Sequence, residues 1–360
     1  MKFIDEFRNK EKAKKIVRAI ENISTKEIKL MEVCGGHTMS IQKFGIPSLL
    51  PPQIELLSGP GCPVCVTDRK YIDQAIAYAR LDNVIITTFG DLIRVPGSSS
   101  SLDNEKAKGR SIKIVYSILD ALKIAKENPT KKVIFLAIGF ETTVPGTAAG
   151  VITAAKENVD NFYVFSSHKV MPPAMNALID EGVKINGYIG PGHVSTITGT
   201  GIYSGLAENF NVGCVISGFE PLDLLQSIYM LVKQFEEKNP KVEIQYKRAV
   251  KVEGNIKAKE MMYDVFEYRD DWWRGLGTLA NSGLGISKKY AKFDAERKFD
   301  VEVEKTKEDK GCICGEILKG LKSPKDCSLF ANVCDPSNPV GACMVSNEGA
   351  CHAFYKYNRE

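Results

Sequence analysis

Residues 133–143, VIFLAIGFETT, contain the pattern that decides the fold. Six apolar residues lead to Gly139 and then to the polar side chains of Glu141, Thr142 and Thr143. A short apolar run closed by glycine is typical of a strand that is buried on both faces of a parallel sheet. This run is also far shorter than the ~20 residues that a membrane-spanning helix needs. We therefore expect a buried parallel strand whose carboxyl end carries polar groups.

The same pattern recurs along the chain, with helix-like stretches such as 68–80 and 102–126 between its copies. Strands that alternate with helices and end in glycine turns predict an α/β fold with parallel sheets. The other apolar runs are IKLMEV before Cys34, QIELLS before Gly59, VIITTF before Gly90, FYVFSS before His168, GYI before Gly190 and CVIS before Gly218.

Two pairs of segments match each other and suggest an internal duplication. GDLIRVPGS at 90–98 aligns with GFETTVPGT at 139–147, and GPGC at 59–62 aligns with GPGH at 190–193. These matches predict two related α/β domains. We expect an N-terminal helix over 1–25, a first domain over 26–128, a second over 129–240, and a cysteine-rich iron–sulfur domain over 241–360.

The composition excludes several classes of protein. The 360 residues are 44% hydrophobic and 26% charged, with a net charge of only +4, and basic residues are interspersed with acids. This balance is typical of a globular protein and argues against a nucleic-acid partner. The N-terminus lacks the apolar segment of a signal peptide, so we expect a cytoplasmic protein that does not enter a membrane. In that reducing compartment, ten cysteines are metal ligands or redox thiols rather than a disulfide framework.

Four C-terminal cysteines are spaced C-x14-C-x6-C-x16-C: Cys312, Cys327, Cys334 and Cys351. Four thiolates from one compact segment suit a [4Fe–4S] cluster. A structural zinc site would use the same ligands, but zinc ligands come more often in C-x2–4-C pairs, so the wide gaps favour the cluster. Cys314 and Cys343 are left over, either as buried thiols or as a redox pair beside the cluster.

A second group of cysteines lies near the N-terminus. Cys62 and Cys65 form a CxxC motif after a predicted strand, which suits disulfide exchange or metal binding. Cys34 ends another predicted strand, and His37 follows it three residues later. Because α/β domains place their sites at the carboxyl ends of parallel strands, these groups predict a soft-metal or thiol site.

The second predicted domain contributes Glu141, Thr142 and His193, again after strands. Taken singly, each is better explained as a helix cap or a turn hydrogen bond. Together, on several strand ends, they predict that this domain completes the site. We expect Cys214 to be a buried structural thiol, and Trp272 and Trp273 to be packing residues.

Five motifs follow one another along the chain: CGGHT at 34–38, GPGCPVC at 59–65, GFETT at 139–143, PGHVS at 191–195, and CICGEILKG with CMVSNEGAC at 312–320 and 343–351. In this order they resemble those of the HypD family of [NiFe]-hydrogenase maturation proteins. The resemblance implies two related α/β domains and a third with a [4Fe–4S] cluster. It also implies a scaffold, formed with the small chaperone HypC, on which iron acquires two cyanides and one carbon monoxide to give Fe(CN)2CO. Cyanide would come from HypE, which HypF loads, and the product would pass toward the hydrogenase large subunit.

The resemblance also assigns roles to single residues. Cys34 would bind the iron together with the N-terminal cysteine of HypC, since such iron favours thiolate ligands. Cys62 and Cys65 would supply electrons or thiol chemistry during cyanide transfer. Cys314 and Cys343 would form a redox pair beside the cluster that passes electrons to them, and Glu348 lies in the matching EGAC block. The side chains that would orient or hydrogen-bond the ligands are His37, Thr38, Glu141, Thr142 and His193.

Two other functions remain open. A stand-alone thiol–disulfide oxidoreductase of the ferredoxin–thioredoxin reductase type would use the same cluster and CxxC motif. Cys34 distinguishes it from a scaffold, because disulfide exchange needs no third thiolate to hold iron. The other alternative is an interaction protein with structural zinc sites only.

Overall fold

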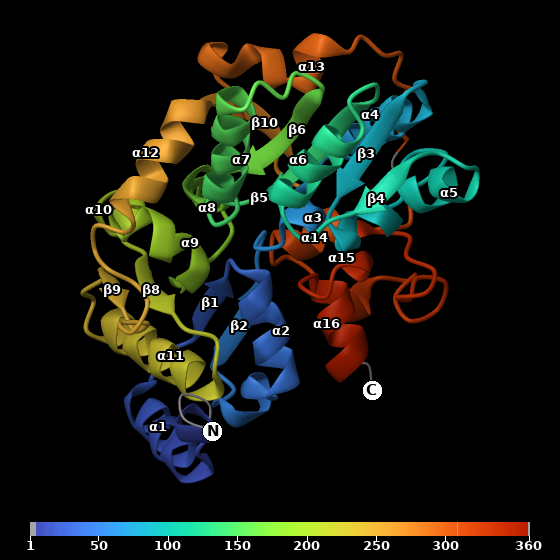
Figure 1. The fold of residues 1–360 in the computed structure, drawn as a ribbon. Coiled ribbons are helices and arrows are strands. Elements are labelled where there is room, and N and C mark those ends of the chain that lie inside the picture. The colour runs from blue at the N-terminus through green and yellow to red at the C-terminus, as the bar shows by residue number, and fades with distance from the viewer. Residues whose placement is uncertain (1–4, 308, 359–360) are drawn as a thin grey trace.

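The computed structural model describes residues 5–307 and 309–358 and contains two sheets (Figure 1). The first, sheet A, has five parallel strands in the order β2-β1-β7-β8-β9. Its strands are β1 (Ile28–Glu32), β2 (Ile54–Ser58), β7 (Gly187–Pro191), β8 (Gly213–Ser217) and β9 (Val242–Ile244).

Sheet B has six strands in the order β10-β11-β6-β5-β3-β4. Its strands β3 to β6 are parallel, and the antiparallel hairpin β10–β11 extends the sheet beside β6. The strands are β3 (Val84–Thr88), β4 (Ile112–Ile114), β5 (Lys132–Gly139), β6 (Phe162–Lys169), β10 (Phe266–Trp273) and β11 (Gly277–Ile286). These two parallel-dominated sheets confirm the predicted α/β class.

Helices connect the parallel strands and begin at residues suited to that position. The Asn9 side chain accepts from the Lys12 amide at the start of α1, and Ser117 and Asp120 form a capping box at the start of α6. The α-helices are α1 (Lys10–Ile23), α2 (Gly35–Lys43), α3 (Pro63–Val66), α4 (Arg69–Arg80), α5 (Leu102–Ala107), α6 (Ile118–Glu127), α7 (Val144–Lys156), α8 (Met171–Asp180), α9 (Gly192–Thr198), α10 (Ser204–Phe210), α11 (Pro221–Glu236), α12 (Ile256–Val265), α13 (Ala295–Lys298), α14 (Cys314–Leu318), α15 (Ala342–Val345) and α16 (Ala350–Tyr357). Within the described ranges, no helix is long and apolar enough to cross a membrane.

The two sheets share a core topology but interleave along the chain. Counted within its own sheet, each begins with the strand order 2-1-3-4, which is the order of one doubly wound α/β fold. Sheet A takes β1 and β2 from before residue 60 and its other strands from after residue 186. The sheets therefore do not follow the expected ranges 26–128 and 129–240, and residues 128–129 lie between α6 and β5 of sheet B.

The matching segments also lie differently from the predicted arrangement. The segments at 90–98 and 139–147 follow β3 and β5, which are neighbours in sheet B. Those at 59–62 and 190–193 follow β2 and β7, which flank β1 in sheet A. Each match therefore relates two turns of the same sheet and not two domains. The sequences are similar because equivalent turns at one sheet edge have the same steric requirements.

Three clusters of buried apolar side chains hold the molecule together. One packs α1 and α11 on sheet A, another lies on the α6–α7 face of sheet B, and the largest fills the space between the sheets and reaches the C-terminal cysteines. The expected domain 241–360 is divided, because β9 joins sheet A and β10–β11 join sheet B. Buried Cys214 and Trp273 are packing residues, as predicted, whereas Trp272 is only partly buried.

Candidate functional site

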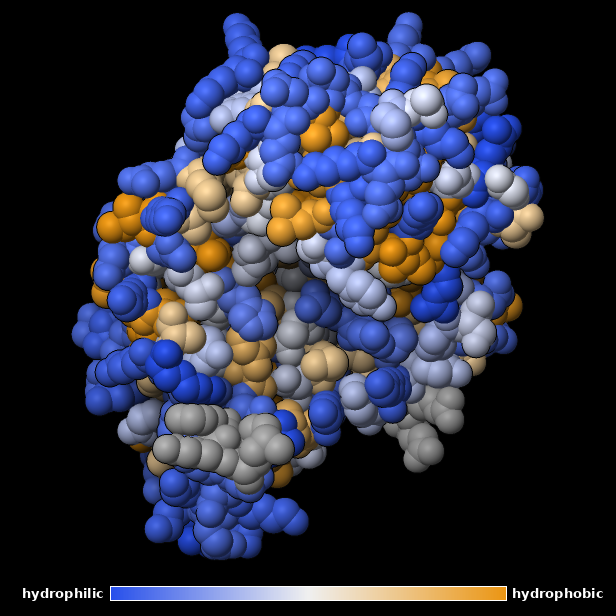
Figure 2. All heavy atoms as spheres, viewed as in Figure 1, coloured by the Kyte–Doolittle hydropathy of each residue, from blue (hydrophilic) through white to orange (hydrophobic). Residues whose placement is uncertain are grey.

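Cys34 lies at the switch point of sheet A, where the strand order reverses. It follows β1, and His193 follows the neighbouring strand β7. The carboxyl ends of strands at such a point form a crevice in which α/β proteins bind their ligands. Figure 2 shows this face of the molecule hollowed near its centre, where the part containing β1 and β2 meets the part containing β5 and β6. The structure thus brings the N-terminal cysteines to the location that the sequence predicts.

The loops around Cys34 touch through their backbones. A Cβ added at Gly61 would lie 2.1 Å from the Cys34 nitrogen, and one added at Gly35 would lie 2.3 Å from the Cβ of Glu348. The Gly35 amide donates to the Gly61 carbonyl at 2.9 Å. Glycine is required at both positions because no larger residue leaves room for this approach. Glu348, far away in sequence, therefore reaches the Cys34 loop.

Glu32 is a site residue that the sequence analysis missed. It is buried directly before the Cys34 turn, where it accepts from the Thr38 hydroxyl at 2.5 Å and from the Cys34 amide at 3.0 Å. Burial raises the pKa of Glu32 to about 8. A carboxylate at the end of a predicted strand, two residues before a cysteine, was a signal that could have identified it. Glu32 and Thr38 together fix the turn that presents Cys34.

Cys34 as a residue is partly exposed, and it forms no disulfide. Burial raises its pKa to about 12, and the nearby charges of Glu348 and Glu32 act in the same direction. The Cys34 side chain is therefore a protonated thiol at neutral pH in the metal-free chain.

Phe219 lies between two histidines. Its ring stacks on His37 with the centroids 4.6 Å apart and on His193 with the centroids 4.0 Å apart. The His37 Nε2 lies 3.3 Å from the Ser217 carbonyl, and its buried Nδ1 is without a hydrogen-bond partner. Burial lowers the pKa of His37 to about 4, so the ring is neutral at neutral pH. The two predicted histidines thus belong to one aromatic stack beside Cys34.

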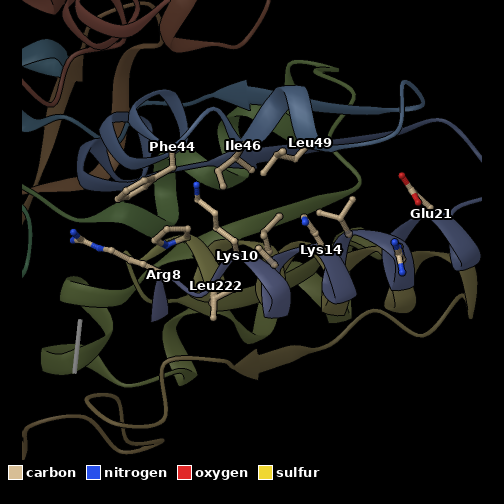
Figure 3. A pocket seen from close by; sticks show the side chains of 13 residues that line it. Arg8, Lys10, Lys14, Glu21, Phe44, Ile46, Leu49 and Leu222 are labelled. Atoms are coloured by element: carbon tan, nitrogen blue, oxygen red, sulfur yellow. The ribbon is translucent and has the colours of Figure 1, made fainter. Parts of the chain in front are cut away.

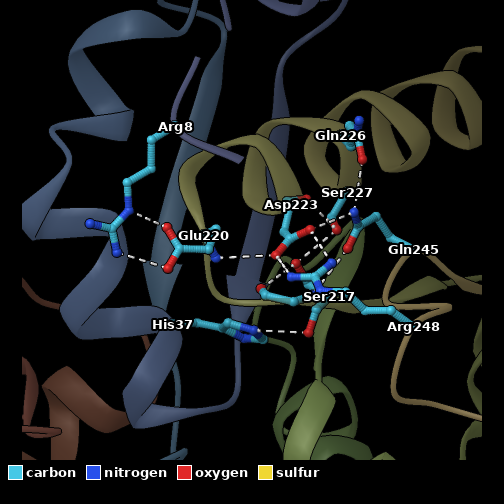
Figure 4. Close-up of polar contacts among 10 residues, drawn as sticks. Arg8, His37, Ser217, Glu220, Asp223, Gln226, Ser227, Gln245 and Arg248 are labelled. Carbon is cyan, nitrogen blue, oxygen red and sulfur yellow. Dashed lines mark hydrogen bonds and ion pairs between the residues drawn. The ribbon is translucent and has the colours of Figure 1, made fainter. Parts of the chain in front are cut away.

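A buried ion pair holds the loop that carries Phe219 (Figure 4). Asp223 is fully buried, and both its oxygens accept from Arg248, at 2.8 and 2.5 Å. It also accepts from the Glu220 amide at 3.2 Å, while Glu220 receives two bonds from Arg8. Because every buried oxygen of Asp223 is paired, the loop is fixed at the site.

Cys62 and Cys65 form a disulfide at the start of α3. Cys65 is fully buried and Cys62 is 3% exposed. The short α3 contacts β5 of sheet B and α15, which carries Cys343. The CxxC motif therefore lies where the two sheets and the C-terminal segment meet.

Glu141 lies at the switch point of sheet B, after β5. It is buried, and its Oε1 accepts from the Met171 amide at 3.1 Å while its Oε2 has no partner. Burial raises the pKa of Glu141 to about 7. Phe140, directly before Glu141, belongs to the same buried apolar cluster as Cys62 and Cys65, so Glu141 lies beside the interior that holds these cysteines. Thr142 is partly exposed and makes no hydrogen bond within the described residues.

The C-terminal cysteines gather around one small cavity. Five of the six line it with Leu329, Phe330 and Met344, and a Cβ added at Gly341 would lie 2.6 Å from two of the sulfurs. Cys343 is fully buried in the same cluster, and interactions with the neighbouring Cys314 and Cys351 thiols lower its pKa. In the described part of the chain, no group of three His, Cys, Asp or Glu side chains is arranged for a single metal ion. The five are Cys312, Cys314, Cys327, Cys334 and Cys351.

A separate apolar groove of about 560 Å³ lies between α1, the end of α2 and the start of α11. Figure 3 shows Phe44, Ile46 and Leu49 on one side of it and α1 with Lys10 and Lys14 on the other. Four cations and one acid surround it: Arg8, Lys10, Lys14, Arg18 and Glu21. The groove is connected to the site because α2 runs from Cys34 to Phe44.

Comparison with known proteins covers nearly the whole chain. The family model described as HypD, hydrogenase formation hypA family, matches residues 11–358. The hydrogenase maturation factor HypD2 of Bradyrhizobium diazoefficiens is 48% identical over all of this chain and 97% of its own length. A putative hydrogenase expression/formation protein of Methanocaldococcus jannaschii is 48% identical over 96% of this chain and 97% of its own. The hydrogenase maturation factor HypD of Escherichia coli is 43% identical over all of this chain and 99% of its own. The chain therefore belongs to the HypD family of hydrogenase maturation factors.

Proposed function

We propose that this protein is the scaffold on which the Fe(CN)2CO group of [NiFe]-hydrogenase is assembled in the cytoplasm. The observation that carries the proposal is the position of Cys34, a partly exposed residue with a free thiol at a switch point, next to a disulfide and two histidines. A free thiolate is a suitable ligand for low-spin iron with cyanide and carbon monoxide. Iron is the cargo here, and its binding would displace the proton that Cys34 holds.

Uncharged polar side chains surround the place where the iron would bind. His37 is neutral, and its Nε2 faces the Ser217 carbonyl, which can only accept, so the ring proton lies on Nε2 and Nδ1 is left as an acceptor. The unsatisfied Nδ1 of His37 and Oε2 of Glu141 are the buried polar atoms that would gain partners in a loaded site. His193, which is exposed, and Glu348 would act at the entrance.

We also propose that a [4Fe–4S] cluster is held by Cys312, Cys327, Cys334 and Cys351. The soft donor set and the apolar lining of the shared cavity support the fit. When bound, the cluster would supply electrons to the neighbouring thiols. Cys314 and Cys343, which are buried neighbours in the same cluster, would then form the redox pair of the chain itself.

The maturation family implies partners in the pathway, and we propose three with direct or indirect roles. HypC would complete the iron site, HypE would deliver the cyanide that HypF prepares, and the hydrogenase large subunit would receive the product. The basic-rimmed groove supports a HypC contact, because a partner that shares iron at Cys34 can follow α2 into it. An acidic amphipathic segment of that partner would complement the groove.

The burial of the CxxC disulfide favours the scaffold over a stand-alone oxidoreductase. Cys65 is inaccessible and Cys62 nearly so, whereas exchange with protein substrates needs an exposed sulfur. Electrons from within the chain could reach the disulfide without such exposure.

Infrared spectroscopy of the anaerobic complex with HypC, produced together with HypE and HypF, tests the function. Cys34→Ala should abolish the bands of iron-bound cyanide and carbon monoxide and leave the C-terminal iron and acid-labile sulfide unchanged. Cys214→Ala, a buried cysteine of β8 outside both sites, is the matched control and should retain the bands. Bands that persist in Cys34→Ala would refute the assigned ligand, and their absence from the native complex would favour the oxidoreductase.

A further inference from the structure

The tip of the β10–β11 hairpin lies between the two cysteine sites. It consists of Trp273, Arg274 and Gly275, far in sequence from both sites. Trp273 is fully buried and stacks on Phe140, directly before Glu141. The hairpin tip is therefore part of the interior shared by both sheets.

Arg274 binds the end of the Cys62–Cys65 turn through three contacts. Its Nε donates to the Cys65 carbonyl at 2.9 Å and its Nη2 donates to the Thr67 carbonyl at 3.0 Å. Its backbone amide donates to the Val66 carbonyl at 3.0 Å. The side chain is buried, with 9% exposed. A planar guanidinium that bonds two carbonyls fixes the orientation of the turn, which a lysine could not do.

The other side of the tip touches the C-terminal cysteines. A Cβ added at Gly275, whose φ is +86°, would lie 2.6 Å from the Gly315 carbonyl oxygen, directly after Cys314. In addition, α15 with Cys343 packs on α3 with Cys65. One buried arginine thus contacts or adjoins both cysteine pairs.

We propose that Arg274 is a positioning residue that holds the Cys62–Cys65 disulfide where the reduced Cys314–Cys343 pair can exchange with it. This inference rests on the proposed internal route of electrons. In the exchange, one thiolate of the reduced pair attacks a sulfur of the Cys62–Cys65 disulfide, breaks that bond and forms a mixed disulfide. The second thiolate then closes the Cys314–Cys343 disulfide, so that two electrons and two protons pass to Cys62 and Cys65.

The test follows each pair separately in the anaerobic, full-length protein with both pairs oxidised. Reduced methyl viologen, an outer-sphere electron donor to the cluster and not a thiol, is added in limiting amount, samples are quenched in acid, and isotope-coded alkylation with peptide mass spectrometry reports each pair over time. Arg274→Gln should slow reduction of Cys62–Cys65 about tenfold, which is less than the roughly 100-fold cost of misplacing reacting groups by a full ångström. Arg274→Lys, which keeps the charge but not the fork, should slow it about threefold.

Two internal controls separate positioning from loss of structure. Reduction of Cys314–Cys343, the C-terminal iron content and the thermal midpoint should stay at their wild-type values in both variants. Arg269→Gln removes an arginine of the same hairpin that bonds Ser166 and Glu296 instead, and it should leave both rates unchanged. If Arg274→Gln does not fold, Arg274→Lys alone decides the question.

The outcomes distinguish this inference from the function on which it rests. If Cys343→Ser leaves the reduction of Cys62–Cys65 at the wild-type rate, the internal route itself is refuted. If Cys343→Ser slows that reduction and neither Arg274 variant does, the route stands and the role of Arg274 is overturned. An equal slowing by Arg269→Gln would also overturn it, because the hairpin as a whole would then be responsible.

Discussion

The two cysteine sites of this protein are built in different ways. The Cys34 site is formed by the strand ends of a complete parallel sheet, and its loops interlock through glycine backbones and a paired buried carboxylate. The C-terminal site is formed by turns and helices of four to eight residues, which cover the cavity that five cysteines line. The first site should keep its shape without a metal, whereas the second should depend on what its thiols bind.

The largest expected effect is on the C-terminal site. Cys351→Ser should release its iron and lower the hydrogen-exchange protection of 312–357 by more than about 4 kcal/mol, since metal binding is folding energy in such a segment. Hydrogen exchange with mass spectrometry would measure this region and the two sheets in the same sample. Sheets A and B should keep their protection. Equal loss of protection in both sheets would mean that the two sites are not independent.

The Cys34 site should instead be sensitive to steric change. Gly61→Ala places a Cβ 2.1 Å from the Cys34 backbone nitrogen, and backbone on both sides cannot move away. We expect a loss of about 3 kcal/mol in the free energy of unfolding, measured by urea denaturation. Gly146→Ala in α7 meets no atom within 4 Å and should gain up to about 1 kcal/mol. A loss at Gly61 no larger than the change at Gly146 would contradict the interlocked loops.

The buried carboxyl of Glu141 should make the stability of the fold depend on pH. Its pKa is about 7 in the folded chain and near 4.5 when unfolded, so it stabilises the fold below pH 4.5 relative to higher pH. This contribution is lost as the pH rises toward 7. Glu141→Gln should therefore gain stability relative to the wild type across this range, levelling off above pH 7 at about 1 to 3 kcal/mol.

Glu105 provides a control of opposite sign. Its hydrogen bonds with Arg80, together with other contacts, lower its pKa to about 2, so its contribution is present above pH 4.5 and lost as the pH falls toward 2. Glu105→Gln should therefore be less stable than the wild type at pH 7, and the difference should shrink in acid. Thermal unfolding from about pH 2 to pH 8, which spans both pKa values, would compare both variants, and parallel curves would exclude the assigned environment of Glu141.

The smallest effect concerns the groove beside the Cys34 site. Replacing Lys10 and Arg18 together by glutamate should weaken HypC binding about tenfold, or about 1.4 kcal/mol, through charge repulsion at the rim. Lys15→Glu, on the same helix but outside the groove, should have little effect. Calorimetric titration at two salt concentrations would measure both, and equal affinities would place HypC elsewhere.

The sequence predicted the strands better than their assembly. Runs such as 133–138 are apolar throughout, so their burial follows from composition, and the turns after them were correctly expected at sheet edges. The division into sheets depends on which strands pair across more than 100 residues, and the local pattern carries no such information. Arg274 and Phe219 were missed for the same reason, because their roles come from contacts with distant loops.

The interleaved strand order also affects how the chain folds during synthesis. β1 obtains its second neighbour only when β7 has left the ribosome, more than 150 residues later. Until then β1 presents an unpaired edge next to Cys34, and unpaired edges of this kind are prone to association. The nascent N-terminal fragment is thus the stage at which chaperones should matter most. A gene split between β2 and β7 would separate strands of sheet A, so neither fragment should fold independently.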